Sequence, residues 1–223
     1  MQQSEWDLVQ EERLSLASML EQQPDSCWAT PSLCAEWSVH HVLAHLVMTP
    51  MRQPRAGTMA RALVHARGHL WRAGRDVAVT YARRPPQELL ALLRDTATAR
   101  TKPLFVVEGN ILLDLVVHGQ DIAVPLGLPR PVPDESARLA LERIWAMGWP
   151  FHARRRIAGT RVECVGLSDT SPVWEAGSGA LVRGSAGALA LLMTGRTDAA
   201  LPSLSGPGVD LLVQRSPSAW TTG

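Results

Sequence analysis

The segment Asp114-Leu-Val-Val-His118-Gly-Gln-Asp121 sets a carboxylate and an imidazole four residues apart inside an apolar run. At helical spacing, residues i and i+4 lie on one face, one turn apart, so the Asp114 and His118 side chains can reach the same point. A divalent metal ion can bridge such a pair. A third ligand could come from His45 in Val42-Leu-Ala-His45-Leu-Val, and three protein ligands leave the open position that a catalytic zinc site needs.

Spacing alone does not single out this pair. His41 with His45 and His65 with His69 have the same separation. His65 and His69 lie among arginines, whose charge would repel a metal ion, so we expect them on a solvated face. For His41 we expect a capping or surface role in the first turn of a helix.

Asp114 and His118 differ from the other pairs because the run 111–118 is otherwise apolar. An unpaired carboxylate is costly to bury, so something should compensate the charge of Asp114. Two interpretations fit these residues equally well: metal binding, or a structural couple in which the carboxylate bonds the histidine or an arginine. Gln120 and Asp121 are candidates for orienting the His118 ring, although Asp121 could equally cap the next turn.

The composition is that of an ordinary globular protein, with 223 residues, 46% of them hydrophobic and 19% charged. A net charge of +1 provides no field for nucleic acid or an anionic membrane, so we expect neither partner. The sequence shows no apolar run of about 18 residues and no signal-peptide pattern, which predicts a cytoplasmic protein. Three cysteines without CxxC spacing favour reduced thiols over a disulfide framework.

Helical periodicity dominates the first two thirds of the chain. One helix is predicted from the amino terminus to about Pro24, and Ser38 can cap a second helix that carries His45 and ends at Pro50. Four further segments are predicted as helical: 58–81, 85–93, 106–122 and 133–147. So many helices in sequence favour a bundle.

The pattern changes after Pro150, where glycine and proline become frequent between short elements. Strands are predicted at 161–167, 181–183 and 209–213, and a short helix at 185–194. We therefore predict an α+β protein that is mainly α. Residues 1–152 would form the helical bundle and residues 153–223 a small α+β domain.

The most distinctive motifs are Cys34-Ala-Glu-Trp-Ser-Val-His-His-Val-Leu-Ala-His45-Leu and Leu113-Asp-Leu-Val-Val-His118-Gly-Gln-Asp-Ile-Ala-Val-Pro-Leu-Gly. Together they resemble the mycothiol-dependent maleylpyruvate isomerase family of actinobacteria, part of the wider DinB-like group of metal-binding four-helix bundles. The segment 174–196 is similar to the small carboxy-terminal α/β domain of many members. The resemblance covers most of the chain and implies a DinB-like bundle followed by that small domain.

In this family a divalent ion, usually zinc, is held by a histidine on the second helix and by a carboxylate and a histidine on a later helix. The resemblance therefore implies His45, Asp114 and His118 as the metal ligands. Asp114 stands where the isomerase has a glutamate, and its arm is shorter by about 1.5 Å, the length of one carbon–carbon bond. Ligation by Asp114 then requires that the helices close up or that a water molecule intervenes.

The resemblance also implies mycothiol, a low-molecular-weight thiol, as cosubstrate, with its sulfur at the open metal position. A metal-bound thiol loses its proton near neutral pH, so the thiolate would be the nucleophile that attacks a small electrophilic substrate. An isomerase would add the thiolate to a carbon–carbon double bond, allow rotation and release it, whereas a transferase would leave it attached. We expect no protein nucleophile and no catalytic residue beyond the metal ligands.

Arginines could hold the polar body of the thiol or an anionic substrate. Arg52 and Arg55 follow the His45 motif, and Arg183 and Arg196 belong to the predicted small domain. Of these, Arg52 and Arg183 are our candidates for cofactor binding, although surface solvation explains exposed arginines equally well.

A function of another class is also open at this point. The chain could be a non-catalytic DinB-like bundle that binds a small ligand or a partner. Asp114 and His118 would then be a structural pair, and the protein would not depend on a metal ion.

Overall fold

The computed structural model describes residues 4–52, 56–65, 67, 70–101, 109–167 and 172–215. Within these ranges, no helix is both long and apolar enough to cross a membrane. The chain divides by its internal packing into two compact units, residues 1–111 and 112–223. The border predicted after residue 152 rests on a change in sequence pattern, not on packing, and it stays a prediction.

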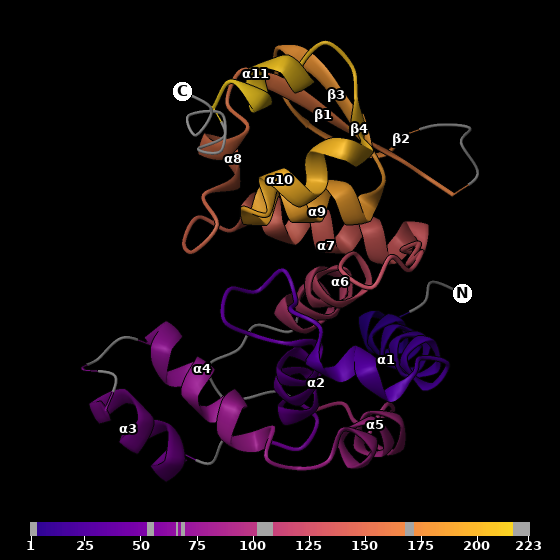
Figure 1. The fold of residues 1–223 in the computed structure, drawn as a ribbon. Helices are drawn as coiled ribbons and strands as arrows, with labels where there is room; N and C mark the ends of the chain where they lie inside the picture. The colour runs from indigo at the N-terminus through magenta and orange to yellow at the C-terminus, as the bar shows by residue number, and fades with distance from the viewer. Residues whose placement is uncertain are drawn as a thin grey trace. The chain divides into compact units, whose positions relative to one another are not determined.

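The first unit is built from helices that pack around aliphatic side chains. Its elements are α1 (Glu5–Glu21), the 3-10 helix η1 (Asp25–Ala29), α2 (Val39–Met48), α3 (Ala56–His65), α4 (Leu70–Tyr81) and α5 (Pro86–Asp95). Helix α2 contacts α4 and α5, α5 contacts α1, and α3 pairs with α4 (Figure 1). Fully buried aliphatic residues of α1, α2 and α5 form its core: Leu8, Leu16, Leu20, Val42, Leu43, Leu89 and Leu93.

Local sequence signals set the ends of these helices. Ser4 caps α1 in a reciprocal capping box with Asp7, and α1 ends at Glu21, before Pro24, as predicted. Ser38 caps α2, which confirms the second predicted helix. Pro86 occupies the first turn of α5, where its missing N–H costs no hydrogen bond.

The prediction of one continuous helix over 58–81 is wrong. The structure has two helices there, α3 ending at His65 and α4 beginning at Leu70. Arg67, between them, has a left-handed backbone with φ of 51°. A right-handed helix cannot pass through such a residue, so the chain breaks at this point although the surrounding composition is helical throughout.

A small sheet and several helices form the second unit. Its elements are α6 (Gly109–Ala123, all but its first three residues), α7 (Asp134–Ala146), α8 (Ala153–Arg156), β1 (Thr160–Val165), β2 (Pro172–Gly177), β3 (Ala180–Gly184), α9 (Ala186–Thr194), α10 (Thr197–Ala200), η2 (Leu201–Ser203), β4 (Leu204–Ser205) and α11 (Val209–Val213). The strands lie in the order β2-β1-β3-β4, with β1 and β3 parallel and the other pairs antiparallel. The predicted α+β class, mainly helical with a small sheet near the carboxyl end, is confirmed.

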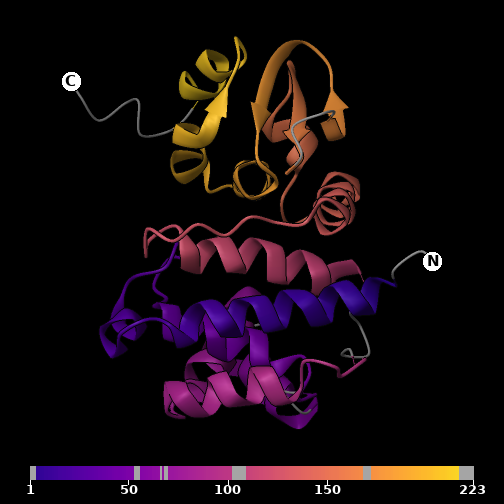
Figure 2. The ribbon, with the colours of Figure 1, turned by 90° about the vertical axis from the view of Figure 1, so that its right-hand side faces the viewer.

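The two faces of this sheet differ in chemistry. Helices α7 and α9 contact the strands on one side of the sheet (Figures 1 and 2). Trp174 of β2 lies on that side, since its Nε1 donates to Glu142 of α7, and Val162 and Cys164 of β1 are buried with it. The opposite face carries Glu163, whose carboxylate accepts a hydrogen bond from Arg183 of β3. This alternation confirms the strand predicted at 161–167.

The strand predicted at 209–213 is wrong, because these residues form the helix α11. Five residues are too few to separate a period of two from a period of 3.6. In the structure one helical turn buries Leu212 and leaves Val213 43% exposed. The last strand is instead β4, and β2, which the sequence analysis did not predict, pairs along one edge of β1.

Arg13 of α1 is a buried cation that joins two helices of the first unit. Its side chain is 1% exposed, and Nη1 donates hydrogen bonds to the carbonyl oxygens of Ala97 at 3.1 Å and Ala99 at 2.9 Å. These carbonyls lie just beyond the end of α5, where backbone acceptors lack helical partners. Burial lowers the pKa of Arg13 to about 10.

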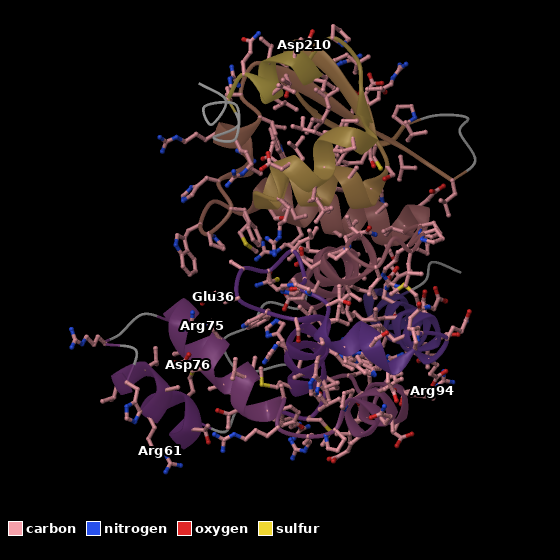
Figure 3. All side chains as sticks on the ribbon, in the orientation of Figure 1. Glu36, Arg61, Arg75, Asp76, Arg94 and Asp210 are labelled. Carbon is pink, nitrogen blue, oxygen red and sulfur yellow. The ribbon has the colours of Figure 1, made fainter. Side chains whose placement is uncertain are left out.

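We predict that Arg13→Ala lowers the free energy of unfolding by about 2–4 kcal/mol, because buried carbonyls lose a charged donor and a large side chain leaves a cavity. Arg94→Ala is the matched control: Arg94 also joins α5 to α1, through an exposed ion pair with Glu21 (Figure 3), and its loss should cost less than about 1 kcal/mol. Urea titration of both variants measures the difference. Equal losses would contradict the role given to Arg13.

Replacing two helical glycines by alanine should change the stability of the protein in opposite directions. A Cβ at Gly187 of α9 would lie 2.6 Å from the buried Gln120 carboxamide, whose Nε2 donates to the Arg130 carbonyl at 2.8 Å, whereas one at Gly74 of α4 would meet nothing within 4 Å. Gly187→Ala should therefore destabilise the protein by about 1–2 kcal/mol, and Gly74→Ala should stabilise it by about 0.5–1 kcal/mol. Thermal melts of both check the signs, and a stabilising Gly187→Ala would show that Gln120 moves without cost.

Candidate metal centre

Helix α6 carries the carboxylate and the imidazole that the sequence singles out. Its neighbouring positions Leu113, Leu115 and Val117 are buried, while Asp114 and His118 are half-buried. A carboxylate oxygen of Asp114 and a ring nitrogen of His118 lie within 4.8 Å of one another. The predicted helix and the predicted common face of the two side chains are both confirmed.

His118 is held by a carboxylate one turn further along α6. Its Nδ1 lies 2.8 Å from Oδ2 of Asp121, at hydrogen-bonding distance, and the Asp121 side chain is 0% exposed. The structure thus shows the contact expected if Asp121 orients His118, and the orienting role itself stays a prediction. Gln120 behaves differently, since its Nε2 donates to the backbone carbonyl of Arg130.

Arg196, in the turn that follows α9, completes the surroundings of Asp121. Its Nε donates to Oδ1 at 3.0 Å and its Nη2 to Oδ2 at 2.8 Å, which is the bidentate geometry of a strong arginine–carboxylate pair. Burial raises the pKa of Asp121, but the hydrogen bond and charge of His118, together with the charge and hydrogen bonds of Arg196, outweigh burial and hold this pKa at about 2. Asp121 is therefore an ionised, buried carboxylate.

The contact between Arg196 and Asp121 was not predicted from the sequence. Arg196 was expected as a donor to a ligand, whereas its guanidinium donates to a carboxylate 75 residues earlier in the chain. Periodicity reports on a residue's own helix and carries no information on pairs so far apart. The sequence indicates such a contact only through the cost of burying the Asp121 carboxylate. That cost predicts that a partner exists but not which residue it is.

His45 belongs to the first unit, on α2, and is half-buried. Its ring lies beside that of Trp37, with the ring centroids 5.5 Å apart and the planes inclined by 47°. Trp37 sits in the segment before α2, where its neighbour Glu36 forms an exposed ion pair with Arg75 of α4 (Figure 3). Packing of this segment thus limits the orientations open to His45.

The remaining histidines of the sequence analysis have other places. His41 completes the capping box of α2, since its Nδ1 accepts from the backbone N–H of Ser38 at 3.2 Å, and the predicted capping role is confirmed. His65 is exposed at the end of α3, as expected of a solvated face. His69 lies outside the described residues.

The candidate arginines are exposed or paired. Arg52 follows α2, is exposed and has a left-handed backbone with φ of 53°. Arg183 is 55% exposed on β3, and its Nε donates to Glu163 at 2.8 Å. Arg55 lies outside the described residues.

The donor set of α6 fits a divalent cation. His118 directs Nδ1 to a carboxylate, an arrangement typical of metal-ligating histidines, in which the other ring nitrogen binds the ion. Asp114 adds a carboxylate on the same face, and carboxylate with imidazole suits zinc and related ions.

These features define a class: a mainly helical α+β protein with a carboxylate and a histidine at ligand spacing on an otherwise apolar helix. The sequence model of the mycothiol maleylpyruvate isomerase N-terminal domain matches residues 9–123, just over half of the chain, and the chain belongs to this family. The family predicted from the sequence motifs is confirmed.

Solved structures agree with this fold. A crystal structure of the mycothiol-dependent maleylpyruvate isomerase is similar with a TM-score of 0.51 and 14% identity over 91% of each chain. A histidine-to-alanine mutant of that isomerase has a TM-score of 0.50 and 13% identity over the same share of each chain. No curated protein matches the sequence significantly.

The low pKa of Asp121 predicts how stability depends on pH. Because the folded-state pKa lies below the ordinary value of 3.8, the ionised carboxylate contributes stability above about pH 4, and this contribution is lost as the pH falls toward 2. In urea titrations, the stability advantage of the wild type over Asp121→Asn should shrink by about 2 kcal/mol across this window. An advantage that stays constant below pH 4 would mean that the pKa of Asp121 is not depressed.

Proposed function

We propose that this protein is a metal-dependent enzyme that uses mycothiol to isomerise, or to transfer the thiol to, a small electrophilic substrate. His45, Asp114 and His118 would be the metal ligands, with zinc the ion that best suits them. The family match carries the proposal, because the matched residues 9–123 contain all three positions. The carboxylate contact of His118 supports it independently.

The ligand types explain why a thiol would be the cosubstrate. Two neutral imidazoles and one carboxylate bring a single negative charge, so a divalent cation at these ligands would retain a net positive charge. When bound, the ion supplies Lewis acidity that favours the thiolate form of mycothiol at its open position. The protein's own share would be to orient His118 through Asp121 and to hold Asp114 and His118 half-buried on an apolar helix.

Arg52 and Arg183 are the proposed donors to the polar body of the thiol. Both are exposed, as a contact with a ligand from solvent requires. Arg183 already donates through Nε to Glu163, so a ligand would contact its terminal nitrogens.

We predict that purified wild-type protein from metal-replete medium contains about one divalent ion per chain, and that His45→Ala and His118→Ala lose it. His65→Ala is the matched control, because His65 has the same i,i+4 spacing to a second histidine but lies exposed on α3 and should leave the metal content unchanged. Elemental analysis measures all four proteins.

Thermal melts with and without a chelator test the same proposal by stability. A bound ion predicts a lower melting temperature on chelation for the wild type and the His65→Ala variant, and no change for His118→Ala. Metal-free wild type, or a His118→Ala variant with full metal content, would refute the metal site and favour a bundle in which His118 is structural.

A further inference from the structure

Three side chains of the second unit form a continuous chain of hydrogen bonds: His118 on α6, Asp121 one turn later, and Arg196 after α9. His118 Nδ1 and Asp121 Oδ2 are 2.8 Å apart, and Arg196 contacts both carboxylate oxygens, at 3.0 and 2.8 Å. Asp121 has no exposed surface and Arg196 is 17% exposed. Water therefore competes little with these bonds.

The direction of these bonds fixes the state of the His118 ring. An ionised carboxylate accepts hydrogen bonds but donates none, so the proton of this contact resides on Nδ1. The Nε2 lone pair then points away from Asp121, so Nε2 is the ring atom that would bind a metal ion. Rotation of the ring about its Cα–Cβ or Cβ–Cγ bond would break the contact with a buried charge, which is costly.

Arg196 in turn fixes the carboxylate. Bidentate donation sets the plane of the Asp121 carboxyl group, and a further bond from Arg196 Nη1 to the Thr194 carbonyl at 3.1 Å ties the guanidinium to the end of α9. Gly195, which separates Thr194 from Arg196, has φ of 99° and ends α9 in a left-handed turn. The end of this helix thus determines where Arg196 can point.

We propose that Asp121, held by Arg196, is a positioning residue that fixes the His118 ring for metal binding. This inference rests on the proposed function, because it needs His118 to be a ligand. It goes further by naming two residues outside the proposed ligand set and predicting that they set the affinity for the metal ion. Carboxylates that support ligating histidines typically contribute 10–100-fold to metal affinity.

A purely structural ion pair is the competing explanation, and the chain provides a matched control for it. Glu163 of β1 is also a buried carboxylate paired with two arginines, Arg161 and Arg183, in the same unit. The structure shows no contact of Glu163 with a histidine among the described residues. Glu163→Gln therefore removes a comparable charge without touching His118.

The experiment compares the zinc affinity of the full-length wild type, Asp121→Asn and Glu163→Gln, by competition with a chromophoric chelator at neutral pH. Circular dichroism of each metal-free protein first establishes that it is folded. Asp121→Asn should weaken zinc binding by about 10–100-fold, and Glu163→Gln should bind like the wild type. With cobalt as the probe, the visible spectrum should change in Asp121→Asn alone, because the His118 ligand changes direction.

Arg196→Gln tests whether Arg196 holds the Asp121 carboxylate. It also replaces Asp121→Asn as the test variant if Asp121→Asn does not fold. It should weaken zinc binding in the same direction, and the double variant should bind no more weakly than Asp121→Asn, because both residues act through one contact. Two results would overturn the inference. In the first, Asp121→Asn and Arg196→Gln bind zinc as tightly as the wild type. In the second, Glu163→Gln weakens zinc binding as much as they do. A wild type that binds no zinc would refute the proposed function itself.

Discussion

The ionised carboxylate of Asp121, which has no exposed surface, is the constraint on which the second unit depends. A buried charge must be compensated in place, and here one partner comes from the same helix and the other from the turn after α9. The two partners tie α6 to the end of α9, and the close approach of Gly187 to Gln120 joins α6 to the first turn of the same helix. A single acidic residue thereby links the candidate ligand His118 to the element that covers the sheet.

Much of the fold follows from local signals in the sequence. Helix ends were predictable where a capping residue or proline marks them, as at Ser38 and Pro86, and β1 was predictable from its alternation. The errors arise where the deciding feature is not local. The break at Arg67 is a backbone conformation, and α11 takes its form from the burial of Leu212 against its surroundings. Short apolar segments adopt whichever secondary structure the tertiary contacts stabilise.

In the candidate site, too, the features set by local spacing were predictable and the long-range contact was not. The helical face shared by Asp114 and His118, and the support of His118 by Asp121, follow from spacing of four and three residues, which a sequence displays directly. The role of Arg196 depends on a contact across 75 residues, and no periodicity encodes it. The cost of burying a charge indicates that a carboxylate on an apolar helix has a cationic partner. Which residue is that partner depends on the tertiary fold.

The family resemblance places Asp114 at a position where it implies a glutamate. Under the proposed metal binding, a carboxylate arm shorter by about 1.5 Å must be compensated by some other movement. We expect little of it from His118, because its ring bonds to Asp121, which is bonded in turn to Arg196. The adjustment therefore falls to His45 or to a water molecule between Asp114 and the ion.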